Sequence, residues 1–397
     1  MLSVYEGFFC GGARILHSDV VLGLREGGQQ HQVLSVHREV YREAARQRME
    51  DDTCYRTLTA AGVSVTSLGR TFDTGGMGPA AFTGRELADT ARAMAGADVV
   101  LSLKEQPLAL LSQPGLPRRP VVVCLHRSDP HNQPRALEDL KSAIAAGTVV
   151  ACVCCAESTR AAYENAGIPP ALLHDIPNGV DLARFRPDAA GRLALRTCLG
   201  ITPPAPVVVF AARYDGMKNV PLFLRAARAW LAGVPDSHVL MCGAGMTPAN
   251  PGLDADITAA FGHHRGDLSS RLHLLGVRRD METVYAAADV VALTSSWGEA
   301  APLCLIEGMM CGAVPVATDV GDSAAIVRGS GIVTPPDPQA IARAWTTATA
   351  ARDTLTPALT ASRERFSRTR MTASYAALLD QVAAAADRPV RSQPLGR

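Results

Sequence analysis

No stretch of this 397-residue sequence approaches the roughly 18 consecutive apolar residues that a membrane-spanning helix requires. The first nine residues contain Glu6 but no Lys or Arg, so they do not resemble a secretory signal peptide. We therefore expect a cytoplasmic protein without stable membrane insertion.

Cysteines are present but scattered, and their ten positions follow no regular spacing. This favours reduced thiols over a disulfide framework. Cys152, Cys154 and Cys155 stand close enough to raise the possibility of a metal site. They fall, however, in the apolar run from Val149 to Ala156, and free cysteine is among the most frequently buried residues. A buried strand is the simpler interpretation, and we expect no metal.

An excess of either charge is also missing, since 39 Lys and Arg residues face 38 Asp and Glu residues for a net charge of +1. A nucleic-acid-binding protein usually carries a basic excess or stripe. We therefore expect no nucleic acid partner. The 47% of hydrophobic residues provide enough apolar material for two buried sheets.

Short apolar runs alternate with longer amphipathic stretches along nearly the whole chain. This alternation predicts parallel sheets with helices on both faces. The expected strands are Leu2–Tyr5, Gln32–Val36, Val63–Leu68, Asp98–Leu103, Pro120–Leu125 and Val149–Cys155, then Pro206–Ala211, His238–Cys242, Arg271–Leu275, Val290–Thr294, Val314–Ala317 and Gly331–Val333. The expected helices are Ala13–Glu26, Arg85–Ala95, Arg135–Ala145 and Ser158–Ala166, then Val220–Leu231, Met281–Ala287, Pro302–Cys311, Pro338–Ala348 and Thr372–Ala386.

The alternation breaks between Pro177 and Pro187 and then restarts, which predicts two Rossmann-like domains. We place an N-terminal domain at 1–186 and a C-terminal domain at 187–370. A helix at 371–386 would return to the first domain, and a tail at 387–397 would be disordered. Open parallel sheets bind ligands at the carboxyl ends of their strands, so two such sheets facing a cleft would hold the site there.

The most informative segment runs from Ser295 to Met309, between an expected strand and an expected helix. It places Glu299 in the loop and Glu307 in the helix among almost exclusively apolar residues. A carboxylate in such surroundings needs hydrogen bonds or a polar ligand, for example the hydroxyls of a ribose. The start of the helix also offers backbone N–H groups to a phosphate. Without further landmarks, the pair would be an ordinary loop acid and helix acid.

A second segment, from Val207 to Asn219, runs from a buried strand into a loop with Arg213 and Lys218. Cations at the carboxyl end of a strand can neutralise a diphosphate without a metal. Each of them alone would more often be a solvated surface cation.

Together these two segments resemble the donor-binding signature of glycosyltransferase family 4, retaining enzymes of the GT-B fold. The E-x7-E motif of that family matches Glu299 and Glu307, and its Arg/Lys pair matches Arg213 and Lys218. Further landmarks follow the family's order, namely Gly11-Gly12-Ala13, His126, Pro177-Asn178-Gly179-Val180-Asp181 with Phe185, Gly243-Ala244-Gly245, Leu275-Gly276 and Asp319-Val320-Gly321. The resemblance covers nearly the whole chain.

The resemblance implies a role for each matched position. Glu307 would bind the ribose, and Glu299 would bind the hydroxyls of the donor sugar. Arg213 and Lys218 would hold the diphosphate, and His126 would contact the transferred sugar near the reacting centre. Backbone groups of Ala301 and Leu303, with Gly243 and Gly12, would complete the donor site.

By the same resemblance, the donor is a nucleoside diphosphate sugar, most simply a UDP- or GDP-sugar, and no other cofactor is needed. The acceptor would carry a hydroxyl and be a small natural product, a glycan or a lipid. The first domain would choose it, with the loops Thr71–Thr83 and Arg127–Pro134 as candidate walls. Arg38, Arg42, Arg46 and Arg48 alternate with acids in what we interpret as a solvated surface helix. The oligomeric state is left open.

Four positions depart from the family pattern. Arg14 stands where Glu usually follows Gly-Gly-Ala, Ala300 replaces a common Gly after Glu299, and Asp322 and Ala325 stand where a Gly and a Glu are usual. These changes leave the sugar and the acceptor open. A non-catalytic sugar-nucleotide binder, or an epimerase or phosphorylase of the same fold, are the alternatives.

Overall fold

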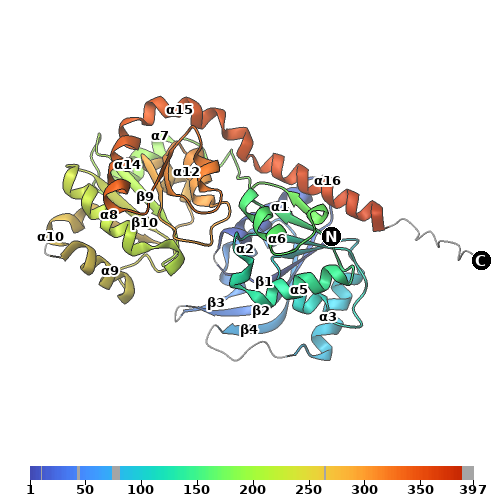
Figure 1. Ribbon diagram of the computed structural model, residues 1–397. Coiled ribbons are helices and arrows are strands. Elements are labelled where there is room, and N and C mark those ends of the chain that lie inside the picture. Colours follow the sequence, from blue (N-terminus) through green and yellow to red (C-terminus); the bar gives the residue numbers. More distant parts are fainter. Residues whose placement is uncertain (10, 43–44, 74–80, 263–264, 387–397) are drawn as a thin grey trace, which may run out of the picture. The chain divides into compact units, whose positions relative to one another are not determined.

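The computed structural model describes residues 1–9, 11–42, 45–73, 81–262 and 265–386, which form two compact units (Figure 1). Unit 1 comprises Met1–Pro177 and the chain from Arg368 onward, and unit 2 comprises Asn178–Ser367. The sequence-based boundary after residue 186 thus falls inside unit 2. The reason is local, since Val180 N–H donates to the carbonyl of Phe366 at 2.8 Å, within unit 2. The tail predicted at 387–397 lies outside the described residues.

Unit 1 is built on an eight-stranded sheet in which β1 lies between β2 and β5. The strand order is β3-β2-β1-β5-β6-β7-β8, and β4 also pairs with β2. The strands are β1 (Leu2–Gly7), β2 (Gln32–Arg42), β3 (Ala45–Arg48), β4 (Ser64–Asp73), β5 (Val100–Leu103), β6 (Val121–Leu125), β7 (Val149–Cys154) and β8 (Leu173–Asp175). Apart from the β2–β3 pair, all pairings are parallel, as the alternating sequence predicted.

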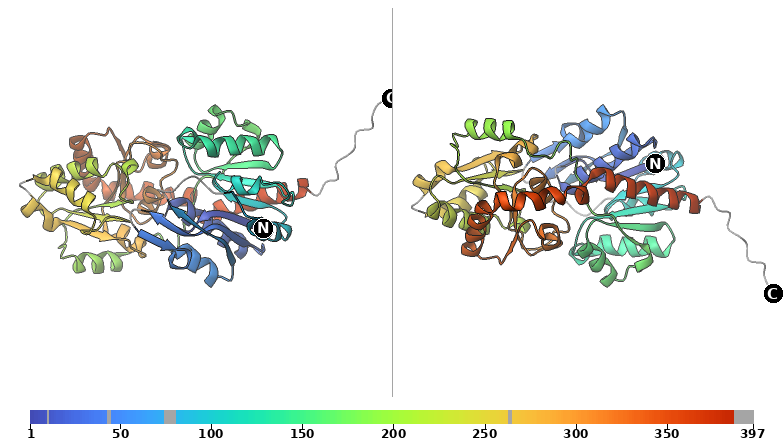
Figure 2. Two further views of the ribbon diagram at one scale, coloured as in Figure 1. Left: turned by 90° about the horizontal axis from the view of Figure 1, so that it is seen from below. Right: turned by 90° about the horizontal axis from the view of Figure 1, so that it is seen from above.

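Helices cover this sheet on both faces. They are α1 (Gly12–Glu26), α2 (Thr53–Ala60), α3 (Gly84–Ala95), α4 (Leu108–Leu111), α5 (Pro134–Ala145), α6 (Glu157–Asn165) and α16 (Arg368–Ala386). The last of these, α16, packs against α1 and lies along unit 1 (Figure 2). Gly23 of α1 permits this approach, because a Cβ there would lie 2.5 Å from the Thr372 hydroxyl oxygen.

The Arg-rich stretch after residue 37 is not a helix, so that prediction is wrong. Arg38 lies in β2 and Arg46 and Arg48 lie in β3, which pairs antiparallel with β2. Ser35, Val36 and Val40 are buried and Arg38 is exposed, and the register of β2 against β4 shifts on both sides of His37, so burial along this strand follows no regular alternation. Opposite charges face each other across the pair, with Arg46 bound to Glu39. Charges four residues apart lie on one face of a helix and also on one face of a strand, so their spacing did not distinguish the two structures.

Unit 2 is a six-stranded parallel sheet in the order β11-β10-β9-β12-β13-β14. The strands are β9 (Val207–Ala211), β10 (His238–Cys242), β11 (Leu272–Gly276), β12 (Val290–Leu293), β13 (Val314–Thr318) and β14 (Ile332–Thr334). Counted along the unit, this is the 3-2-1-4-5-6 order of a Rossmann domain, whose topological switch point lies between strands one and four. The switch point of unit 2 therefore lies between β9 and β12.

The helices of unit 2 fill the crossovers between these strands. They are α7 (Ala189–Cys198), α8 (Val220–Gly233), α9 (Pro251–Phe261), α10 (Arg265–Leu268), α11 (Met281–Ala287), α12 (Leu303–Met310), α13 (Ser323–Val327), α14 (Pro338–Ala350) and α15 (Arg352–Ala361). Phe210, Phe223, Trp230 and Trp345 stack in the core between the sheet, α8 and α14. The loops after β9 and β12 are thus held on a rigid layer.

Candidate functional site

The loop after β9 carries Arg213 and Lys218 and lies against the loop after β10. Gly243 makes this close approach possible, since its φ is +137° and a Cβ there would lie 2.0 Å from the carbonyl oxygen of Ala212. The Tyr214 N–H donates to the carbonyl of Ala244 at 2.8 Å. Gly243 thus supports the backbone that presents Arg213, whose guanidinium pairs with Asp215 at 3.3 Å.

Hydrogen bonds also join the loop after β9 to the loop after β12. Asn219 adopts a left-handed conformation, caps α8 through Leu222 N–H, and donates to the Ser296 hydroxyl at 2.8 Å. The Thr294 hydroxyl donates to the Lys218 carbonyl at 3.1 Å. These bonds fix the two loops that flank the switch point of unit 2. No pattern in the sequence indicated this role of Asn219.

Lys218 and Glu299 meet at this switch point. The Lys218 ammonium contacts Glu299 Oε1, and the Ser295 hydroxyl donates to the same oxygen at 2.6 Å. Both side chains are largely buried, with 15% and 8% of their surface exposed. A buried ion pair of this kind is not an ordinary surface salt bridge, and it places a cation and an anion together at the expected ligand crevice.

The loop after β13 supports the backbone of Glu299. Gly321 has a φ of +59°, and a Cβ there would lie 2.3 Å from the Glu299 carbonyl oxygen. The Asp322 N–H donates to the Ala300 carbonyl at 2.8 Å. The sequence landmark Asp319-Val320-Gly321 therefore acts on the second loop through direct backbone packing.

Glu307 lies in α12 and is 9% exposed. Its carboxylate accepts a hydrogen bond from the Tyr285 hydroxyl, and burial, followed by the charge of Glu307, holds the pKa of Tyr285 well above its ordinary value. Burial likewise raises the pKa of the Cys304 thiol to about 12, and nearby Glu299 and Glu307 act in the same direction. Both acids therefore lie near one thiol that stays protonated. Tyr285 is a partner of the site that sequence reasoning missed.

The first turn of α12 completes this group of residues. Pro302 precedes the helix, and no side chain caps its N-terminus. The carbonyl of Ala301 accepts a hydrogen bond from Asn178 at 3.0 Å, so the entry to the helix is anchored. The backbone N–H groups of Leu303 and Cys304 lie in the first turn, where a helix has no carbonyl to accept their hydrogen bonds. Such N–H groups can bind an anion at the start of a helix.

Seven of the nine predicted site residues lie in unit 2, on the loops after β9, β10 and β12 and in α12, and the remaining two belong to unit 1. His126 follows β6, and its Nε2 is buried with no hydrogen-bond partner in the described part of the chain. Burial, then Lys104, His17 and Arg127, lower the pKa of His126 well below its ordinary value, so the imidazole is neutral at pH 7. Gly12 is the first residue of α1. Among the glycines of the candidate acceptor loop, Gly75, Gly76 and Gly78 lie outside the described residues.

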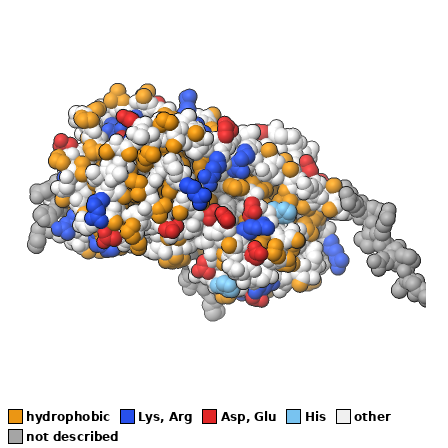
Figure 3. Space-filling model, turned by 45° about the horizontal axis from the view of Figure 1, so that its top comes forward, with side chains coloured by type: hydrophobic (Ala, Val, Ile, Leu, Met, Phe, Trp, Pro, Cys, Tyr) orange, Lys and Arg blue, Asp and Glu red, His pale blue; other side chains and the backbone are white. Residues whose placement is uncertain are grey.

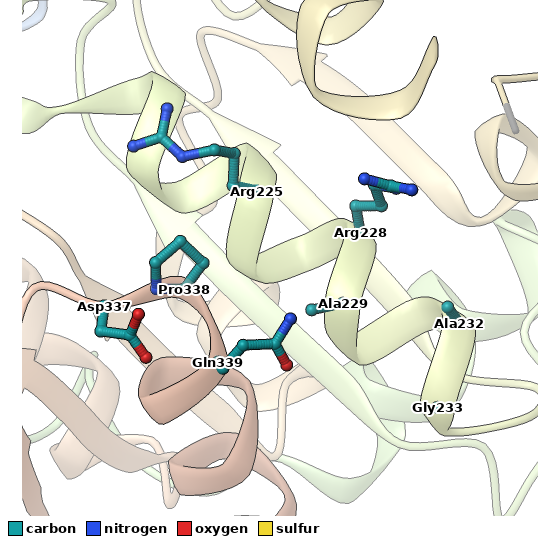
Figure 4. Close-up of a pocket in the computed structure, with 8 residues that line it drawn as sticks. All are labelled: Arg225, Arg228, Ala229, Ala232, Gly233, Asp337, Pro338 and Gln339. Atoms are coloured by element: carbon teal, nitrogen blue, oxygen red, sulfur yellow. The ribbon is translucent and has the colours of Figure 1, made fainter. Parts of the chain in front are cut away.

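A groove of about 630 Å³ lies elsewhere in unit 2, between α8 and the start of α14 (Figure 4). Arg225, Arg228 and Gln339 line it, and no predicted site residue does. On the face shown in Figure 3, basic and acidic side chains are interspersed. No described helix is long and apolar enough to cross a membrane.

Comparison with known proteins supports the resemblance. Residues 11–184 match the family model "Glycosyltransferase Family 4", and residues 205–350 match "Glycosyl transferases group 1". Both halves of the chain therefore carry glycosyltransferase family domains. The matched ranges contain every predicted site residue.

Curated relatives of this chain include D-inositol 3-phosphate glycosyltransferases. The protein of that name from Mycobacterium sp. (strain KMS) is 36% identical over 162 residues, which is 40% of this chain and 34% of the relative. The one from Rhodococcus jostii (strain RHA1) is 32% identical over 168 residues, or 41% and 35% of the two chains. The similarity thus spans about a third of the length of these curated relatives.

Solved structures share the fold at low sequence identity. HepE from Anabaena, crystallised with UDP and glucose, superposes with a TM-score of 0.76 at 22% identity and covers 96% of this chain and 99% of its own. Sucrose-phosphate synthase from Thermosynechococcus elongatus gives a TM-score of 0.69 at 18% identity, over 97% and 99% of the chains. The predicted GT-B class, with two Rossmann-like parallel-sheet domains, is confirmed.

Proposed function

We propose that this protein transfers a sugar from a nucleoside diphosphate sugar to an acceptor hydroxyl, with retention of the anomeric configuration and without a metal ion. The observation that carries the proposal is the buried contact of Lys218 with Glu299 at the switch point of unit 2. The family 4 model that matches residues 11–184, and the UDP and glucose bound by HepE, support this proposal.

The donor would be held by groups of opposite charge. Glu307, oriented by Tyr285, accepts hydrogen bonds from the ribose hydroxyls. Arg213, Lys218 and the amides at the start of α12 bind the diphosphate, and Glu299 binds the hydroxyls of the donor sugar. Ligand binding then exchanges the Lys218–Glu299 contact for two contacts to the substrate, which keeps both buried charges satisfied.

In the transfer step, the bond between the anomeric carbon and the diphosphate oxygen breaks, and the acceptor oxygen bonds to that carbon from the face just vacated. The acceptor proton leaves with the nucleoside diphosphate. Arg213 and Lys218 stabilise the charge that develops on the diphosphate, and removing one such group typically costs about 10²–10³-fold in rate. His126, neutral at pH 7, would contact the transferred sugar. A cytoplasmic setting, expected from the sequence, would supply such donors.

A panel of nucleotides tests the donor. UDP, GDP, ADP and dTDP, with their sugars, are compared by thermal unfolding, because a nucleotide that binds the folded state raises the unfolding temperature by mass action. We expect one nucleotide, UDP or GDP, to give the largest rise. Sugar transfer is then followed by nucleoside diphosphate release and by NMR of the product's anomeric proton. Binding without release would favour the non-catalytic alternative, and an EDTA-sensitive rate would contradict metal independence.

A further inference from the structure

Unit 1 has a switch point of its own, between β1 and β5. β1 pairs with β2 on one side and with β5 on the other, so the crossovers leave in opposite directions there. α1 begins after β1, Lys104 directly follows β5, and His126 and Arg127 follow β6. In an open parallel sheet this edge is where a ligand binds. The ends of three neighbouring strands thus bring Lys104, Arg127 and the first turn of α1 to one crevice.

Lys104 is held firmly at this edge. Its N–H donates to the carbonyl of Cys124 at 3.1 Å, and its own carbonyl accepts from the Ser102 hydroxyl at 2.7 Å. Its φ is +68°, a left-handed conformation that a lysine seldom adopts. The chain therefore presents this side chain from a fixed position.

Two of the three cations at the crevice are paired. Arg14, in the first turn of α1, lies 3.8 Å from Glu6 and donates to the Gly7 carbonyl. Arg127 lies 3.7 Å from Glu105, which also accepts from the Tyr163 hydroxyl. For the Lys104 ammonium, no ion pair or hydrogen bond is found within the described residues. Burial, then Arg14 and Arg127, lower the pKa of Lys104 to about 8.

An ammonium in such a place is stabilised by an anion, because a charge withdrawn from water needs a partner. Arg14, buried in the first turn of α1, adds positive charge to the same edge. The neutral His126 beside Lys104 has its Nε2 buried without a partner, so it offers the ligand an uncharged polar contact. Lysine itself is rare here, as only Lys104, Lys141 and Lys218 occur in the chain.

We propose that this crevice binds the anionic group, a phosphate or a carboxylate, of an acidic acceptor, with Lys104 as its main cation and Arg127 beside it. The inference rests on the proposed function, since it names the acceptor class of the same reaction. Lys104 binds the anion in unit 1, whereas Lys218 binds the donor in unit 2. Both are expected to act on the substrate directly.

The three lysines allow a direct binding test. Reductive methylation with ¹³C-formaldehyde gives each lysine a ¹³C-dimethyl NMR signal and keeps its charge, and lysine-to-arginine variants assign the signals. Inorganic phosphate is titrated into the full chain with UDP or GDP at saturation. We expect the Lys104 signal to shift and the pKa of Lys104 to rise, while the Lys141 signal stays unchanged. Lys141 is a matched control, because it pairs with Glu138 at 3.2 Å on the surface of α5.

The acceptor class is tested with two matched sets of three compounds: glucose, glucose 6-phosphate and glucuronate, and glycerol, glycerol phosphate and glycerate. We expect an acidic member of a set to be a better acceptor than the neutral one, and the phosphate and carboxylate members distinguish the two anions. Lys104→Met should lower kcat/KM for that acceptor about 10- to 100-fold, the value of a hydrogen bond to a charged group. The donor KM should be unchanged, Lys104→Arg should restore part of the loss, and Lys141→Met should behave as wild type.

Three results would overturn the inference: a silent Lys104 signal with phosphate, a preference for the neutral acceptors, or a Lys104 signal that moves with UDP or GDP but not with phosphate. The last would assign the crevice to the donor. Failure of the proposed function would give a different result. In that case no nucleotide would shift the Lys218 signal, whereas the Lys104 signal would still report whether phosphate binds. The two ideas therefore fail separately.

Discussion

Lys218 and Glu299 are 81 residues apart in the sequence, and their side chains are in contact at the switch point of unit 2. Taken alone, each residue would be interpreted as a charged side chain on a surface loop. The contact arises because β9 and β12 are neighbours in the sheet, so the loops that follow them meet. In the proposed complex, the cation binds the diphosphate of the donor and the anion binds the hydroxyls of its sugar.

Loss of either partner should nearly abolish transfer. We expect Lys218→Ala and Glu299→Ala each to reduce kcat/KM at least about 10²–10³-fold, because a preorganised contact to the developing charge or to the sugar is removed. Far-ultraviolet circular dichroism and thermal unfolding should show an intact fold. Lys141→Ala, at an exposed lysine of unit 1, is the control and should keep full activity. Full activity of either site variant would refute the site.

Glu307 should contribute to nucleotide affinity rather than to the chemical step. Glu307→Gln keeps the shape of the side chain but weakens the hydrogen bonds to the ribose, so we expect the Kd of the nucleotide to rise about 10- to 100-fold. Isothermal titration calorimetry measures this directly. Glu282→Gln is a suitable control, since Glu282 is half-exposed and pairs with Arg184 at 2.7 Å. An unchanged Kd would mean that Glu307 has no part in binding.

The sequence predicted β9, β10, β12 and β13 closely because each is a buried apolar run. The strand His238–Cys242 and the helix Met281–Ala287 were predicted with their observed bounds. What was missed depends on tertiary contacts. β8 was missed because it has only three residues. α7 was missed because it is held in place by Arg192 and Arg196, which both bind the buried Asp289. A pattern along the chain carries no sign of such partners.

The candidate site was predictable for a different reason. Glu299, Glu307, Arg213 and Lys218 were identified as a set through their resemblance to a family, since each alone is ambiguous. The residues that hold the set in place, Asn219, Ser295 and Tyr285, gave no comparable signal. Their roles are hydrogen bonds made across loops, and these become visible once the strand order is known.

Gly243 should be intolerant of a side chain. Its φ of +137° and a Cβ position 2.0 Å from the Ala212 carbonyl oxygen predict that Gly243→Ala displaces the loop of Arg213. We expect a loss of about 1–3 kcal/mol in the free energy of unfolding and weaker nucleotide binding. Gly216→Ala is the matched control in the same loop, because a Cβ there meets nothing within 4 Å. Urea unfolding and nucleotide titration of the two variants decide the matter, and equal behaviour would contradict the packing argument.

Two buried histidines of unit 1 should contribute to a loss of stability in mild acid. The Ser3 hydroxyl is shared by His17 at 2.9 Å and His31 at 2.8 Å, and the two imidazoles are 1% and 6% exposed. Burial lowers the pKa of each to about 3, and for His31 the charges of His17 and the N-terminus add to it. Between pH 3 and about 6.5, the ordinary pKa of histidine, the unfolded chain therefore binds protons that the folded chain does not.

The unfolding free energy should consequently be insensitive to these histidines above about pH 6.5 and fall as the pH decreases below it, by up to about 1.4 kcal/mol per pH unit for each imidazole. Measurements between about pH 6.5 and pH 5 avoid most carboxylate titration, so urea unfolding in this window reports the imidazoles. His17→Asn should reduce the slope of stability against pH, whatever its effect on stability itself. His131→Gln removes an exposed imidazole and should leave the slope unchanged. A flat profile in the wild-type protein would show that the buried imidazoles accept protons without unfolding, contrary to their enclosure around Ser3.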